Sequence, residues 1–176
     1  MVEYRDGNLL TAKVDIIAHQ VNCQGKMNSG FAKELKTRSR NLLQEYRQMC
    51  KEHRFSESLM GMTQIVESEG YSAKGREGAK KLVANLFAQF TESQEGIRTT
   101  DYTSLKQAFL HLKAMCETLD FATKDGTWTI GIPHGIGCGY GGGDWKIVEK
   151  IIHDIFDESQ VITAVIFKKE SEEDDN

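Results

Sequence analysis

Residues 127–145 read TWTIGIPHGIGCGYGGGDW, an apolar run that ends at Pro133 and passes into a glycine-rich loop and then a helix. Six of the nine residues from Gly135 to Gly143 are glycine. Glycine lets the backbone approach a ligand closely, and consecutive N–H groups beside a helix N-terminus bind phosphate. A flexible surface loop is the alternative interpretation. The spacing matches neither GxxxxGK[ST] nor GxGxxG, which disfavours a P-loop NTPase and a Rossmann enzyme.

On both sides of this segment, apolar runs alternate with stretches of helical periodicity. The predicted strands are 2–6, 15–22, 62–67, 81–90, 127–133 and 161–167, and the predicted helices are 30–36, 40–53, 103–123 and 145–157. This alternation predicts a three-layer α/β/α domain over 1–169, with a central mixed, partly parallel sheet, followed by an acidic flexible tail at 170–176. Ligands of such sheets bind beyond the carboxyl ends of strands. We therefore expect the loop at 23–29 and the glycine-rich loop to form facing walls of one cleft.

Composition places the chain among ordinary globular proteins. It has 176 residues, of which 39% are hydrophobic and 27% charged. The net charge of −4 argues against a nucleic-acid backbone as the main partner. The four cysteines show no CxxC spacing, which indicates reduced thiols and no structural metal. The opening MVEYRDGNLL does not resemble a signal peptide, and no apolar run is long enough for a membrane span, so we expect a cytoplasmic protein without a membrane partner or a cofactor.

Four further features follow one another along the chain. They are Gly7–Leu9 (GNL), His19–Cys23 (HQVNC), Met27–Ala32 (MNSGFA) and Ile132–Gly141 (IPHGIGCGYG). In this order they resemble the GD[IL], VNAAN or HxxNC, GGG[VI]A and P-x-[IL]-G-[SC]-G-[IL]-[YF]-G motifs of the macrodomain family. Within that family the motifs are most similar to the branch of ADP-ribose-1″-phosphate phosphatase and terminal ADP-ribose glycohydrolase.

The resemblance implies ADP-ribose or a derivative as ligand. Asn8 and Leu9 would border the adenine, and Phe167 would stack on it unless it only fills the core. The diphosphate and the distal ribose would be held by Asn28, Ser29, Gly30, Phe31, Ile136, Gly137, Cys138, Gly139, Tyr140 and Gly141.

Three residues are candidates for catalysis. His19 would act as acid or base, or else be a buried strand histidine. Asn22 would orient ribose hydroxyls, or hold the loop backbone. Asp144 would orient water, or cap the following helix. The lysine of the glycohydrolase is not evident near Gln89, and its loop aspartate aligns with Gly141, which argues against a lysine-based covalent mechanism.

Two functions remain open at this point. The first is a hydrolase that acts on ADP-ribose-1″-phosphate, or on ADP-ribose attached to protein or nucleic acid. The second is a non-catalytic module that reads or sequesters ADP-ribose. A nucleophilic Cys23 or Cys138, paired with His19 or His134, is a further alternative.

Overall fold

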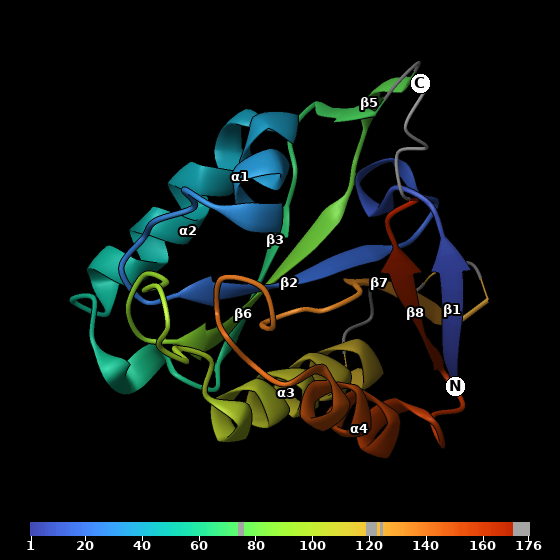
Figure 1. Ribbon diagram of the computed structural model, residues 1–176. Coiled ribbons are helices and arrows are strands. Elements are labelled where there is room, and N and C mark those ends of the chain that lie inside the picture. Colours follow the sequence, from blue (N-terminus) through green and yellow to red (C-terminus); the bar gives the residue numbers. More distant parts are fainter. Residues whose placement is uncertain (74–75, 119–122, 124, 171–176) are drawn as a thin grey trace, which may run out of the picture.

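A six-stranded sheet forms the middle of the molecule (Figure 1). The computed structural model describes residues 1–73, 76–118, 123 and 125–170. The strands of the sheet are β1 (Val2–Asp6), β2 (Ile16–Asn22), β3 (Thr63–Glu67), β6 (Leu82–Gln89), β7 (Trp128–Pro133) and β8 (Ile162–Lys168). Their order is β1-β8-β7-β2-β6-β3, and every neighbouring pair is parallel except β3 with β6. The predicted mixed, partly parallel sheet is confirmed.

Helices cover both faces of this sheet. They are α1 (Gly30–Leu35), α2 (Arg40–Glu52), α3 (Tyr102–Thr118) and α4 (Trp145–Phe156), with 3-10 helices at Leu9–Thr11, Lys36–Arg38 and Glu57–Leu59. The helices α1 and α2 lie on one side, and α3 and α4 on the other (Figure 1). The three-layer α/β/α arrangement follows.

The alternation of side chains along β2 explains why both faces are covered. Ile16 and Ala18 belong to the apolar cluster that contains Phe109 of α3 and Ile152 of α4. Ile17, between them in sequence, belongs to a separate cluster on the other face. Because successive residues of a strand point to opposite faces, a strand that is apolar at consecutive positions needs cover on both sides.

Two strands were not predicted. The strands β4 (Tyr71–Ala73) and β5 (Arg76–Ala79) pair as an antiparallel hairpin. The sequence here reads as a basic turn, because no apolar alternation marks two strands this short. Lys81, at the end of that basic stretch, is half-buried and donates from Nζ to the carbonyls of Ala12 and Val14, at 3.1 and 2.7 Å.

Two predicted boundaries extend beyond the described residues. The structure shows α3 as far as Thr118, and residues 119–122 of the predicted helix lie outside the described part of the chain. So do residues 171–176 of the predicted acidic tail. Within the described residues, no helix has the length and apolarity that a membrane span requires.

The sheet opens between β2 and β7. Their pairing is confined to Ile16 with Ile130 and Ile17 with Gly131, although the strands continue to Asn22 and Pro133. The carboxyl ends of these two parallel strands therefore separate at one edge of the sheet. The loops that leave them begin on the two sides of this gap.

Candidate functional site

A cavity of about 440 Å³ lies between the loop that follows β2 and the loop that follows β7. The first wall includes Asn28–Phe31, and the second runs from Pro133 to Gly141 without Cys138. His19 and Asn22, at the carboxyl end of β2, complete the part of the lining that was predicted from the sequence. The two loops expected to face each other do so.

The glycine-rich wall presents unpaired main-chain donors. Gly137, Gly139, Tyr140 and Gly141 line the cavity, and their N–H groups donate to no acceptor within the described part of the chain. Such a group of N–H donors attracts an anion without a positively charged side chain. Tyr140 is 68% exposed, so this residue stands at the mouth of the cavity.

A segment between β6 and α3 holds the glycine-rich loop in place. The N–H groups of Thr99 and Thr100 both donate to the carbonyl of Gly141, at 3.0 and 3.1 Å. The hydroxyl of Thr100 donates to the carbonyl of Gly137, at 2.7 Å, and accepts from Gln20 Nε2, at 2.8 Å. The sequence analysis did not single out these threonines, because they belong to no motif.

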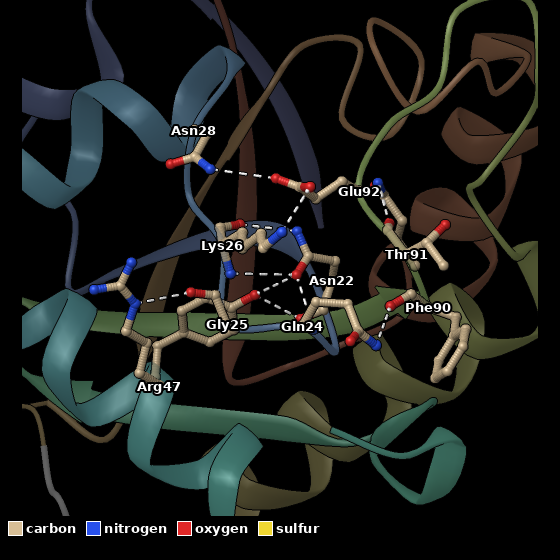
Figure 2. Close-up of polar contacts among 11 residues, drawn as sticks. Asn22, Gln24, Gly25, Lys26, Asn28, Arg47, Phe90, Thr91 and Glu92 are labelled. Atoms are coloured by element: carbon tan, nitrogen blue, oxygen red, sulfur yellow. Dashed lines mark hydrogen bonds and ion pairs between the residues drawn. The ribbon is translucent and has the colours of Figure 1, made fainter. Parts of the chain in front are cut away.

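Asn22 fixes the turn that follows β2 (Figure 2). Its Nδ2 donates to the carbonyl of Lys26, at 2.8 Å, while its Oδ1 accepts from the N–H of Gln24, at 2.9 Å, and from the hydroxyl of Tyr46, at 2.8 Å. Asn22 is only 8% exposed. Of the two roles considered for this residue, the structure shows the one that holds the loop backbone.

Two ionisable side chains of the lining were missed by the sequence analysis. Lys26 Nζ lies 3.1 Å from Glu92 Oε2, and Asn28 Nδ2 donates to Glu92 Oε1, at 3.2 Å (Figure 2). The hydrogen bond from Lys26 lowers the pKa of Glu92. Lys26 and Asn28 come from the loop after β2, and Glu92 from the loop after β6, so this contact joins two walls. No sequence motif marks it, because the partners are far apart in the chain.

His19 is a buried histidine at the bottom of the cavity. It is 1% exposed, its Nε2 lies 2.6 Å from Asn85 Oδ1, and its ring centroid lies 6.0 Å from that of Phe31. Burial lowers its pKa to about 4, against which the hydrogen bond to Asn85 acts weakly. The imidazole is therefore neutral at physiological pH, and its Nδ1 has no partner among the described residues.

The residues assigned to adenine lie outside this cavity. Asn8 caps the 3-10 helix Leu9–Thr11 by accepting from the N–H of Leu10, at 3.0 Å. Leu9 and Phe167 are buried in one apolar cluster, against which Phe31 packs. Phe31 thus contacts both the cavity and the cluster that holds Leu9 and Phe167, and none of the three residues assigned to adenine lines the cavity.

Asp144 and the cysteines occupy structural positions. Asp144 is the N-cap of α4, where its carboxylate accepts from the N–H of Lys146, at 2.9 Å, and it is not part of the cavity lining. Burial raises the pKa of Cys23 to about 12 and that of Cys138 to about 11. Neither thiol ionises readily at neutral pH, which disfavours a cysteine nucleophile. No cluster of His, Cys, Asp and Glu suited to a metal ion occurs among the described residues.

Known proteins resemble the whole chain. No protein-family model matches it. The DNA ADP-ribosyl glycohydrolases of Mycobacterium bovis and Mycobacterium tuberculosis are each 25% identical to it over 167 residues. These residues are 95% of this chain and 42% of either relative, so the chain spans less than half the length of the curated relatives it matches.

Solved structures share the fold. The macrodomain of Mycobacterium tuberculosis DarG superposes with a TM-score of 0.73 at 23% identity, over 95% of this chain and 97% of that one. Thermosipho africanus DarTG, solved in complex with ADP-ribose, superposes with a TM-score of 0.69 at 14% identity, over 94% of this chain and 42% of that one.

Proposed function

Since this chain has the fold of a macrodomain, we propose that it binds the ADP-ribose group between its β2 and β7 loops and hydrolyses a bond to that group. The relative that is a DNA ADP-ribosyl glycohydrolase and the neighbour solved with ADP-ribose support this proposal. The observation that carries it is the row of unpaired N–H groups at Gly137, Gly139, Tyr140 and Gly141.

In this proposal the diphosphate of the ligand lies against the row of unpaired N–H groups. Main-chain donors in a concave loop stabilise phosphate oxygens and make no demand on net charge, which is −4 in this chain. Asn28, Ser29, Gly30 and Phe31 form the opposite wall, with Ile136 and Cys138 beside the row. The adenine then lies toward Leu9 and Phe167, in the cluster that Phe31 contacts, with Asn8 next to Leu9 in the chain.

The surroundings of the cavity favour an ADP-ribose group attached to a larger molecule as the substrate. A second hollow opens beside the cavity, is lined by Ile97 and Arg98 among others, and shares Gly139 and Tyr140 with it. Ile97 and Tyr140 are both exposed there. This surface offers room for a protein or nucleic acid that carries the modification. ADP-ribose-1″-phosphate is the small-molecule candidate for the same cavity.

The candidate catalytic residues differ in their surroundings and therefore in what each can contribute. His19 is neutral and can accept a proton from water or from a substrate hydroxyl, but it cannot supply one at neutral pH. Asn22 positions the loop at Lys26, and Asp144 positions the start of α4. Their contribution to hydrolysis is to keep the two walls at a fixed separation.

A non-catalytic ADP-ribose reader is the second candidate, and one observation favours it. Asn22 and Asp144 already hydrogen-bond within the protein, which leaves His19, His134, Tyr140 and the pair Lys26–Glu92 as the ionisable side chains of the cavity lining.

Two measurements test the proposal. Calorimetry with ADP-ribose, and with AMP as the control, tests binding; we expect ADP-ribose to bind more tightly because AMP lacks the diphosphate. Turnover of ADP-ribosylated DNA, ADP-ribosylated protein and ADP-ribose-1″-phosphate tests hydrolysis. Binding without turnover of any of the three substrates would support the non-catalytic ADP-ribose reader. Absence of ADP-ribose binding would contradict both functions.

A further inference from the structure

A row of polar side chains crosses the sheet beneath α2. His19 on β2, Asn85 on β6 and Gln64 on β3 stand in register, because His19 pairs with Asn85 and Gln64 pairs with the same residue from the other side. Asn85 is as deeply buried as His19, and Gln64 is partly exposed. Three neighbouring strands thus place one polar residue each side by side in a largely apolar layer.

Each hydrogen bond in the row has a determined direction. Gln64 Nε2 donates to the backbone carbonyl of Glu45 in α2, at 3.0 Å, and a carbonyl can only accept. Gln64 therefore turns Oε1 toward Asn85, whose Nδ2 donates to it at 3.0 Å. Asn85 in turn presents Oδ1 to His19 Nε2, at 2.6 Å. His19 Nε2 must then carry the proton.

This direction decides what His19 offers to the cavity. A neutral imidazole protonated on Nε2 has a lone pair on Nδ1 and no second N–H. Nδ1 is buried and has no partner within the described residues, and His19 belongs to the lining of the cavity beside Phe31. An acceptor in this position attracts a hydroxyl donor and repels a phosphate oxygen.

We propose that Gln64 and Asn85 are positioning residues that hold His19 as the hydrogen-bond acceptor for a sugar hydroxyl of the bound ADP-ribose. The inference rests on the proposed function, and it adds what that function leaves open: the part of the ligand that His19 recognises, and the residues that set its tautomer. Gln64 lies outside the cavity lining, so its effect on the ligand passes through Asn85 and His19.

Two substitutions of Gln64 test whether the direction of the hydrogen bonds matters, or only the contact between Gln64 and Asn85. Gln64→Glu keeps an acceptor facing Asn85 Nδ2 and so preserves the direction of the row. Gln64→Met has a similar size but no acceptor, which frees the Asn85 amide to turn over. Heteronuclear NMR of the nitrogen-labelled full chain reads the His19 tautomer, and calorimetry reads the affinity for ADP-ribose.

We expect the Nε2–H tautomer in the wild type and in Gln64→Glu, with similar affinity for ADP-ribose. In Gln64→Met we expect a mixture of tautomers and an affinity lower by about fivefold, as for the loss of one neutral hydrogen bond. An Nδ1–H tautomer in the wild type overturns the proposed role of the polar row, and so does a tautomer change that leaves the affinity for ADP-ribose unchanged. Neither result bears on the proposed function. A wild type that does not bind ADP-ribose overturns the proposed function as well.

Discussion

His19 and Asn22 lie on one strand, but their side chains differ in how far their hydrogen-bonding groups are already used within the protein. His19 keeps the regular pairing with β6 and points into the layer beneath α2. The register shifts between Val21 and Asn22, so Asn22 leaves the alternation and turns toward its own loop. One irregularity in the strand thus separates His19, whose Nδ1 has no partner among the described residues, from Asn22, whose amide bonds to its own loop.

We predict that Asn22→Ala destabilises the protein by about 2 kcal/mol, because the N–H of Gln24 and the carbonyl of Lys26 lose their partner, while Tyr46 keeps its hydrogen bond to the Asn22 carbonyl. Urea denaturation measures the change. Asn28→Ala is the matched control: the one side-chain hydrogen bond that Asn28 makes among the described residues, to Glu92, is a solvent-exposed bond, and we expect a change within about 0.5 kcal/mol. Equal effects of the two substitutions would contradict the anchoring role of Asn22.

The buried His19 makes stability depend on pH. Its pKa falls from 6.5 in the unfolded chain to about 4 in the fold, with no ionised side chain among the causes. The unfolded state therefore binds the proton first, and the stability conferred by neutral His19 is complete above about pH 6.5 and is lost as the pH falls toward about 4.

We predict that the wild type loses about 2 kcal/mol more stability than His19→Gln between about pH 7 and about pH 5. Denaturation of both proteins at the two pH values measures this difference. All groups other than His19 are common to the two proteins, so their titration cancels. A wild type and a variant that weaken in parallel would show that His19 titrates normally in the fold.

At the scale of elements, the glycine-rich loop needs glycine for close packing against neighbouring side chains as much as for a positive φ. Gly137 has a φ of 72°, and a Cβ at this residue would lie 2.7 Å from Gln20 Oε1 and 3.1 Å from Thr100 Oγ1. Gly139 has no such φ, and a Cβ there would meet nothing within 4 Å. Only the first of these glycines is required by the fold.

We predict that Gly137→Ala destabilises the protein by about 2 kcal/mol, because alanine is strained at this φ and collides with Gln20 and Thr100. Gly139→Ala, two residues away, should change the unfolding midpoint little. Thermal unfolding of the two variants beside the wild type measures this, and a Gly139→Ala variant as unstable as Gly137→Ala would refute the distinction.

Elements with strong periodicity could be predicted from the sequence, and elements held by distant contacts could not. All six strands of the sheet and its four helices were predicted, with boundaries within a few residues where the structure describes them, because apolar faces repeat along them. The hairpin of β4 and β5 was missed, since its strands are only three and four residues long and show no apolar alternation.

The site divides in the same way. Both loops of the cavity were found, because glycine and asparagine leave a local signature at strand ends. Glu92, Thr100 and Gln64 were not, because each acts through a partner far away in the sequence: Lys26, Gly137 and Asn85. Such a contact becomes visible only when the order of the strands is known.

At the scale of the whole molecule, the cleft arises from strand order. β2 has β6 on one side and β7 on the other, and its loop and that of β7 depart toward opposite faces, α1 on one and α4 on the other (Figure 1). A ligand held between these loops contacts segments that lead into both layers of helices. Its binding should therefore stabilise the molecule as a unit.

We predict that ADP-ribose at a hundredfold excess over its Kd raises the free energy of unfolding by about 2.7 kcal/mol, as mass action requires for a ligand of the folded state alone. Differential scanning calorimetry should show one transition that moves to higher temperature, with both helix layers unfolding together. Gly139→Ala, which leaves the fold intact but places a methyl group on the cavity wall, should reduce this shift. A variant stabilised as strongly as the wild type would mean that the ligand binds away from the glycine-rich loop.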